Sequence, residues 1–273
     1  MHPINCKLLS KLKTFEQGHI AEVELTKGSI PNMIAYADQI VCNETTIQLP
    51  VYLIKTNEEG ICRLFINTSI NNGEYLSISE GDFFEINISE YSHFKIPERC
   101  KKMLLLMEEA ALFDNLVIID FLSFNGVEAN VYVKAGEQGE LLGYLQHYHN
   151  INLITSLDNF KLQTIFNNQV IGTRLYISGS WSMINFVKNV AYNSGFTDDE
   201  IQYNGLGQKK EKIMCVKCYA FNTNQTGDEI EEMICEHCNT KLEVSSHYSR
   251  RLGAYLGYVK AEEAVIGVER RKK

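Results

Sequence analysis

Two cysteine pairs constrain this chain more than any other feature of its sequence. Cys215 and Cys218 form one C-x-x-C motif, Cys235 and Cys238 form another, and 16 residues separate the two motifs. This spacing is typical of a site in which four thiolates bind one metal ion. Each motif is short enough for a tight knuckle turn to direct both sulfurs at one ion. The alternatives are a redox-active pair, which needs only one C-x-x-C, and four buried thiols without a metal.

A tetrahedral site with four sulfur ligands suits Zn²⁺, or iron in a rubredoxin-like site. We expect zinc, with iron as the alternative. Because four thiolates leave no position for water or substrate, the metal is expected to be structural or electron-carrying, and no catalytic residue is expected. His237, inside the second motif, is an alternative ligand. The stretch between the motifs, with Asn222 and Asn224, is expected to be a polar, hairpin-like connection.

Charge is divided unevenly along the chain, whose net charge is −8. Residues 209–273 hold 12 basic and 10 acidic side chains, so the preceding part carries a net charge of −10. An acidic body repels phosphate backbones, and we therefore expect no nucleic-acid partner. No apolar run reaches the ~18 residues of a membrane-spanning helix, so no membrane partner is expected either.

The other four cysteines, Cys6, Cys42, Cys62 and Cys100, are scattered without a pairing rhythm. The N-terminus has no apolar signal core. Free thiols are typical of a reducing compartment, and we expect a cytoplasmic protein.

The sequence up to residue 97 predicts a small antiparallel β-barrel. Its β-branched and aromatic runs are separated by turn signals such as Asn-Asn-Gly and Glu-Gly-Asp. Regular strand spacing of this kind is typical of a barrel. The predicted strands are residues 19–25, 47–55, 61–67 and 83–88.

Residues 98–208 predict a Rossmann-like domain, because strand and helix patterns alternate there. The predicted strands are residues 103–107, 129–134, 152–154 and 174–178. The predicted helices are residues 108–122, 139–148, 157–166 and a segment from Ser180 to Gly195. The β-branched triplet at 117–119 favours a strand instead, so that helix has an alternative. Residues 205–212 are expected to form a polar linker.

The predicted fold class is therefore α+β with three domains: a β-barrel (1–97), a Rossmann-like parallel α/β domain (98–208) and a zinc-ribbon or rubredoxin-like module with four cysteines (209–273). No Ser-His-Asp order, H-E-x-x-H motif or P-loop occurs, which argues against hydrolases and kinases.

The first two domains resemble ferredoxin–NAD(P) reductase-like flavoproteins, including siderophore reductases. The resemblance lies in the Gly81-Asp82 strand, in the strand and loop at 103–113, in the Tyr-x-x-Gly turn from Tyr176, and in the closing segment 195–201. It implies FAD and NAD(P)H sites. Tyr52, in Pro50-Val51-Tyr52-Leu53, occupies the place of the family's flavin-stacking tyrosine.

Two departures from that family count against its cofactors. Pro50 stands where an arginine would bind the flavin phosphate. The loop that should be glycine-rich contains Glu108 and Glu109, and carboxylates beside a phosphate are electrostatically unfavourable. We therefore do not expect FAD, and we expect weak binding of NAD(P)H or none.

The string Ser-His-Tyr-Ser-Arg-Arg-Leu-Gly-Ala-Tyr-Leu-Gly at 246–257 follows the cysteines closely. A four-cysteine site followed by this string resembles the C-terminal domain of the dimethylamine monooxygenase DmmA-like family. The resemblance implies an accessory or electron-relay subunit of a multi-component amine monooxygenase. Its implied partners are a haem-bearing component and a flavin/iron–sulfur reductase component.

Arginine and tyrosine are enriched at binding hot spots. We therefore assign partner binding to His247, Tyr248, Arg250, Arg251 and Tyr255. A structural cap on the metal module is the alternative for this cluster. For the whole chain, the alternatives are an active flavin- and NAD(P)H-dependent reductase and a zinc-ribbon interaction scaffold.

Overall fold

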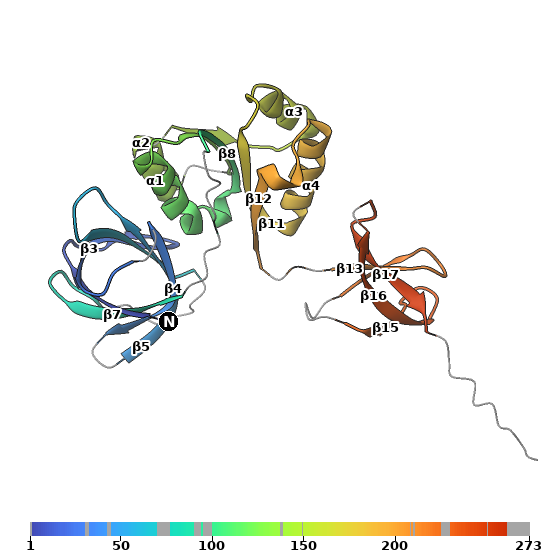
Figure 1. Ribbon diagram of the computed structural model, residues 1–273, viewed down its shortest axis with the longest axis horizontal. Helices are drawn as coiled ribbons and strands as arrows, with labels where there is room; N and C mark the ends of the chain where they lie inside the picture. The colour runs from blue at the N-terminus through green and yellow to red at the C-terminus, as the bar shows by residue number, and fades with distance from the viewer. Residues whose placement is uncertain are drawn as a thin grey trace, which may run out of the picture. The chain divides into compact units, whose positions relative to one another are not determined.

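The computed structural model describes residues 2–30, 33–42, 45–69, 77–89, 94, 100–136, 139–148, 150–207, 209, 211–224, 230–249 and 251–260. The chain forms two compact units, Met1–Leu206 and Gly207–Lys273 (Figure 1). None of the helices in these described ranges is long and apolar enough to cross a bilayer.

The first part of unit one is a closed antiparallel barrel. Its strands pair in the ring order β1-β7-β4-β5-β6-β3, and β3 pairs back with β1, while β2 extends the edge of β3. Inward residues such as Val23, Ile40 and Ile66 are buried and form the barrel core. The strands are β1 (His2–Leu8), β2 (Lys13–Phe15), β3 (Gly18–Lys27), β4 (Ile34–Cys42), β5 (Thr45–Lys55), β6 (Ile61–Asn67) and β7 (Phe83–Ser89).

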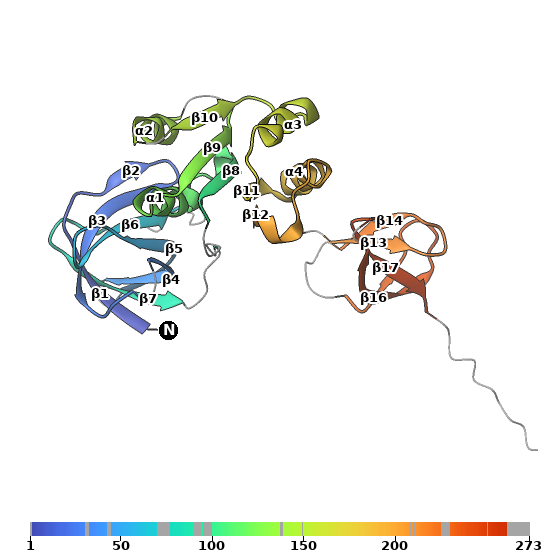
Figure 2. The ribbon, with the colours of Figure 1, turned by 45° about the horizontal axis from the view of Figure 1, so that its top comes forward.

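The second part of unit one is a parallel sheet of order β10-β9-β8-β11-β12 with helices on both faces (Figure 2). The strands are β8 (Lys102–Glu108), β9 (Glu128–Lys134), β10 (Ile151–Ile154), β11 (Arg174–Ser180) and β12 (Ile201–Leu206). The α-helices are α1 (Leu116–Phe124), α2 (Glu140–Tyr148), α3 (Asn159–Asn167) and α4 (Trp181–Asn193), and a 3-10 turn, η3 (Asp198–Glu200), precedes β12. The predicted fold class is confirmed, although β12 takes the start of the expected 205–212 linker.

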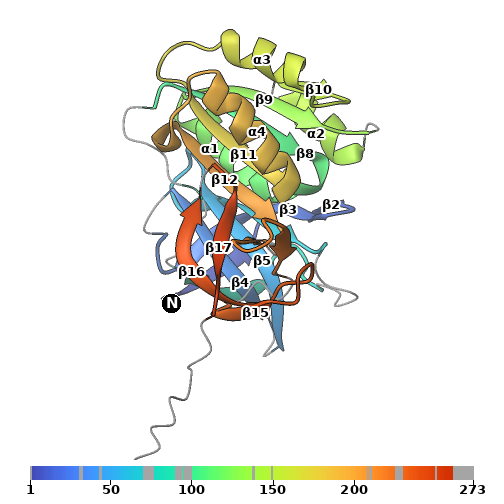
Figure 3. The ribbon, with the colours of Figure 1, turned by 90° about the vertical axis from the view of Figure 1, so that its right-hand side faces the viewer.

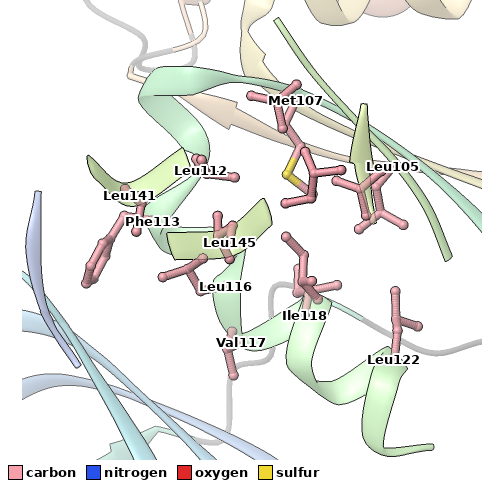
Figure 4. Packing of buried hydrophobic residues seen from close by; sticks show 14 of the residues in the cluster. Leu105, Met107, Leu112, Phe113, Leu116, Val117, Ile118, Leu122, Leu141 and Leu145 are labelled. Carbon is pink, nitrogen blue, oxygen red and sulfur yellow. The ribbon is translucent and has the colours of Figure 1, made fainter. Parts of the chain in front are cut away.

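Alternation along the buried strands separates two cores. On β8, Leu105 and Met107 face α1 and α2, whereas Leu104 and Leu106 face α3 and α4. This period of two is what a strand covered on both faces requires. Figure 4 shows Leu105 and Met107 beside side chains of α1 and α2.

The helix predicted at 108–122 is wrong at its start. Two 3-10 turns, η1 (Glu109–Ala111) and η2 (Phe113–Asn115), come before α1. Asn115 explains the break, because its Nδ2 donates to Ala111 O at 2.5 Å and to Ser178 Oγ at 2.9 Å. Its Oδ1 accepts from the Tyr176 hydroxyl at 2.8 Å. Such side-chain bonds compete with regular helix formation.

The first seven residues of helix α1, from Leu116 to Leu122, are all buried. A short helix that is apolar on all sides must be covered on all sides. Its residues share one core with barrel residues Ile54 and Phe65. On the barrel side, Asp120 accepts from Arg63 of β6 at 2.5 Å. The β-branched triplet at 117–119 therefore reflects burial, not a strand.

Unit two is a small sheet of order β14-β13-β17-β16-β15. Its strands are β13 (Lys212–Cys215), β14 (Phe221–Thr223), β15 (Glu232–Ile234), β16 (Lys241–Ser249) and β17 (Ala254–Val259). Strands β16 and β17 are antiparallel neighbours (Figure 3). Among the described residues, its buried cluster consists of Cys215, Cys235 and Leu242, with Cys218, Met233 and Cys238 packed against it.

Gly18 at the start of β3 is a close-packed point of unit one, and its substitution is a test of the packing. A Cβ built there would lie 2.1 Å from Ile66 O and 2.7 Å from the Phe113 ring. Gly18→Ala should lower the free energy of unfolding by about 2 kcal/mol or more, since neither neighbour can move freely. Gly136→Ala is the control, because no atom lies within 4 Å of its Cβ position and its φ is not positive. Equal urea midpoints for the two variants would contradict this packing.

Candidate functional site

The first cysteine motif is a knuckle turn between β13 and β14. Cys215 N donates to Ala220 O at 2.9 Å, and Tyr219 N donates to Cys215 O at 2.8 Å. These bonds turn the chain so that both sulfurs of the motif lie on its inner side. Tyr219 closes the turn with a φ of 61°, a conformation that glycine or asparagine adopts more readily.

The second motif repeats this geometry between β15 and β16. Cys235 N donates to Thr240 O at 2.9 Å, and Asn239 N donates to Cys235 O at 2.9 Å. Asn239 closes the turn with a φ of 52°. The residues at the usual glycine positions therefore adopt the glycine-like conformation in both turns.

The two knuckles bring all four thiols together, as the spacing predicts. The Sγ atoms of Cys215, Cys218, Cys235 and Cys238 all lie within 4.8 Å of one another. Cys215 and Cys238 are 3.8 Å apart, and Cys218 and Cys235 are 3.6 Å apart. Zn–S bonds of about 2.3 Å in a tetrahedron place sulfurs roughly 3.8 Å apart. The cluster therefore has the dimensions of a four-thiolate metal site, and His237 is exposed outside it.

Asn222 supports this cluster, and the sequence interpretation missed it. Asn222 and Asn224, from the expected polar connection, are buried, with 0% and 2% exposure. Asn222 Nδ2 donates to Cys235 Sγ at 3.6 Å, and its Oδ1 accepts from Glu236 N at 2.8 Å. It thereby links β14 to the second knuckle. Its place on a short strand seven residues after Cys215 is the sequence signal that could have identified it.

The environment favours a thiolate at one cysteine and opposes it at another. Burial raises the pKa of Cys235, but hydrogen bonds from backbone amides and Asn222 outweigh burial and lower the pKa to about 6. At Cys218, a backbone hydrogen bond at Ala220 lowers the pKa, but burial and the other three sulfurs raise it to about 12. Crowded thiolates oppose full deprotonation, which a bound cation would relieve.

The residues assigned to partner binding lie on the β16–β17 hairpin. Tyr248 and Tyr255 are cross-strand partners with ring centroids 5.1 Å apart. The ammonium of Lys209 lies 5.9 Å from the Tyr248 ring centroid. His247 and Arg251 are exposed, and Arg250 lies outside the described residues. The hairpin therefore presents aromatic and cationic side chains together.

Tyr52, the candidate flavin-stacking residue, is engaged within unit one. Its ring centroid lies 5.3 Å from that of Tyr36. Its hydroxyl donates to Asp114 Oδ1 at 3.4 Å, and Asn67 Nδ2 donates to the same oxygen at 2.5 Å. Burial, together with the Asp114 carboxylate, raises the pKa of Tyr52. The phenol therefore remains a donor that joins β5 to η2.

Glu108 ends β8 at the point where the sheet order reverses, between β8 and β11. Its Oε2 accepts from Ser180 N at 2.6 Å, and its Oε1 accepts from Lys134 Nζ at 3.3 Å. Ser180 is the N-cap of α4. Glu109 begins η1, and its Oε1 is directed toward Gly139, just before α2. The two glutamates predicted to oppose phosphate therefore lie in different surroundings.

Trp181, the single tryptophan of the chain, follows Ser180 directly. Its ring covers Gly205 of β12, where an added Cβ would lie 2.3 Å from the indole. Tyr203 meets it edge-on, with centroids 6.2 Å apart. The indole therefore packs against the β12 edge of the sheet.

The C-terminal sheet matches a known family. Residues 212–258 match the family described as dimethylamine monooxygenase subunit DmmA-like, C-terminal domain. A curated relative is the heme-dependent oxidative N-demethylase delta subunit of Ectopseudomonas mendocina (strain ymp), which is 30% identical over 109 residues. The match covers 40% of this chain and 61% of the relative, less than two thirds of that protein's length.

Solved structures show the same fold as the larger unit. Phthalate dioxygenase reductase has a TM-score of 0.52 and 13% identity, covering 82% of this chain and 77% of that one. The FAD/NAD binding domain of nitric oxide dioxygenase from Vibrio cholerae O1 biovar El Tor has a TM-score of 0.51 and 9% identity, covering 75% and 98%. At these identities the likeness establishes the fold alone.

The four cysteines and the hairpin after them thus lie within one matched segment. Over residues 212–258, the chain is similar to the dimethylamine monooxygenase subunit DmmA-like family.

Proposed function

We propose that the protein is an accessory or electron-relay subunit of a multi-component amine monooxygenase in the cytoplasm. The observation that carries this proposal is the four-thiol cluster, which lies inside the segment that matches the DmmA-like family. The relative's description as a delta subunit of a heme-dependent N-demethylase supports a role beside other subunits. Its partners would be a haem-bearing component and a flavin/iron–sulfur reductase component.

The proposed metal is Zn²⁺, with iron as the alternative. Four sulfur ligands at these separations suit either ion. All coordination positions would be filled by Cys215, Cys218, Cys235 and Cys238, so the ion would not bind substrate. A zinc site would be structural, whereas an iron site could carry one electron. The chain would then consist of three domains, at residues 1–97, 98–208 and 209–273. The last of them would hold both the metal ion and the docking surface.

The reductase-like unit is proposed to be degenerate, without FAD. Tyr52 is engaged with Tyr36 and Asp114, and Pro50 cannot supply the positive charge that a flavin phosphate needs. An active flavin- and NAD(P)H-dependent reductase is the second candidate, favoured by the fold shared with phthalate dioxygenase reductase. A colourless zinc-ribbon scaffold without electron transfer is the third.

A visible spectrum of the purified protein separates the three candidates. The proposal predicts no yellow flavin absorption and far less than stoichiometric flavin in the protein. Iron–thiolate absorption would favour electron relay, and a colourless protein that contains zinc would favour a structural subunit. Stoichiometric flavin that NADH reduces would overturn the proposal in favour of the reductase.

Removal of one metal ligand should unfold unit two and leave unit one intact. A structural zinc can contribute on the order of 10 kcal/mol to the folding of a small module, and Cys215 is fully buried. Cys215→Ser should therefore lose the bound metal, measured by mass spectrometry, and expose residues 207–273 to protease. Cys100→Ser, which alters a free thiol of unit one, is the control. A protease-resistant module after chelation at neutral pH would contradict the metal site.

Docking is tested at the β16–β17 hairpin. The double variant Arg250→Ala with Arg251→Ala should weaken binding to the oxygenase components about tenfold or more, as truncation of an interface hot spot does, with unchanged metal content. Lys241→Ala with Lys260→Ala is the matched control, because it removes two positive charges that pair with Glu232 in the same unit. If both doubles assemble normally, this surface is not the docking site. Loss of metal from the arginine double would identify a structural cap.

A further inference from the structure

The crevice at the carboxyl ends of β8 and β11 is where an open α/β sheet of this kind binds its ligand. Strand order reverses between these two strands, and open α/β sheets generally bind their ligands outside the carboxyl ends of the strands at such a point. The N-terminus of α4 adjoins it, and unpaired backbone N–H groups at a helix N-terminus attract anions. An unmodified crevice would therefore present an anion site.

In this chain the anion is already present as a side chain. Glu108 Oε2 lies 2.6 Å from Ser180 N, a distance typical of a strong, charge-assisted hydrogen bond. Glu108 Oε1 also pairs with the Lys134 ammonium at 3.3 Å, and the Glu108 side chain is 19% exposed. The Glu108 carboxylate thus pairs with both the Ser180 N–H and the Lys134 ammonium.

The backbone of β11 is shaped to admit this carboxylate. A Cβ at Gly179 would lie 2.8 Å from Glu108 Oε2 and 3.0 Å from Glu108 Cγ. Only glycine at this position lets the side chain reach Ser180 N. The contact therefore depends on two positions, Glu108 and Gly179, that come from different strands.

We propose that Glu108 is an internal anion that closes the switch-point crevice to phosphate-bearing nucleotides. This inference rests on the proposed function, in which unit one is not a reductase. A phosphate near Ser180 N would have to displace the carboxylate or lie beside it, and like charges at such distances repel strongly in a partly buried site. The fold of a nucleotide-binding domain is retained while its ligand position is filled by its own chain.

The Glu108 carboxylate is charged under the conditions in which it would act. Burial raises its pKa, but hydrogen bonds from Ser180 and Lys134 outweigh burial, so the pKa lies below its usual value of 4.5. A lowered pKa contributes stability that is present above the unfolded value and is lost as pH falls through the folded value. At neutral pH the closure is therefore complete.

Thermal melting with inorganic phosphate tests the closure. At matched ionic strength, phosphate should leave the melting temperature of unit one unchanged in the wild type. In Glu108→Ala, which frees Ser180 N and Lys134, phosphate in excess of its dissociation constant should raise it by about 3 °C. Glu109→Ala is the matched control, since it removes the same charge one residue away but not the contact with Ser180.

Calorimetric titration with NADH gives a second measurement. The wild type and Glu109→Ala should bind NADH weakly or not at all, and Glu108→Ala should have a dissociation constant at least about tenfold lower, because a repulsive charge has been removed from the ligand position. Glu108→Gln keeps an acceptor for Ser180 N and removes the charge, so it should fold and show a smaller response of the same sign. If Glu108→Ala fails to fold, the response of Glu108→Gln shows whether the Glu108 charge prevents NADH binding.

The outcomes separate this inference from the proposed function. If the wild type binds NADH and reduces an electron acceptor with it, the proposed function fails, and the closure fails with it. If the wild type ignores NADH but Glu108→Ala and Glu108→Gln respond to phosphate no more than Glu109→Ala does, only the closure by Glu108 is overturned.

Discussion

Burial of helix α1 on every side is the constraint on which unit one depends. The helix packs on the parallel sheet with one face and on barrel strands β5 and β6 with another, so one apolar core runs through both. Separating the barrel from the sheet would expose that core to water at about 25 cal/mol per Å². Two polar contacts link the barrel to the segment around α1: Tyr52 with Asp114, and Arg63 with Asp120. The shared apolar core therefore fixes the partners of these contacts relative to each other.

Unit two would depend on metal binding more than on an apolar core. Within the described part of the unit, its buried cluster consists of Cys215, Cys235 and Leu242, and so small an apolar core supplies little folding energy by itself. A metal bound by four thiolates would provide the missing stability and would fix the backbone of β16 and β17. A rigid hairpin is a good platform for Tyr248 and Tyr255, because little conformational freedom is lost when a partner binds.

The sequence predicted the parts of this structure that depend on local pattern or spacing. The C-x₂-C spacing indicated the thiol cluster, and alternating apolar runs indicated the parallel sheet. Features that depend on contacts between distant residues were missed. The 3-10 turns before α1 follow from bonds between Asn115 and β11, and Asn222 was assigned to a polar connection although it is buried beside Cys235. The role of Glu108 was seen as repulsion, whereas its bond to Ser180 becomes evident only once β8 and β11 lie side by side.

Because Trp181 lies in unit one and the four thiols lie in unit two, the two units would have different optical signals. As the single tryptophan of the chain, Trp181 follows the serine that contacts Glu108 and lies against the edge of the sheet. Tryptophan emission therefore comes from unit one alone, because unit two contains tyrosine but no tryptophan. Thiolate-to-metal absorption would belong to unit two alone. Events at the crevice and at the metal centre can therefore be followed independently in the same unlabelled sample.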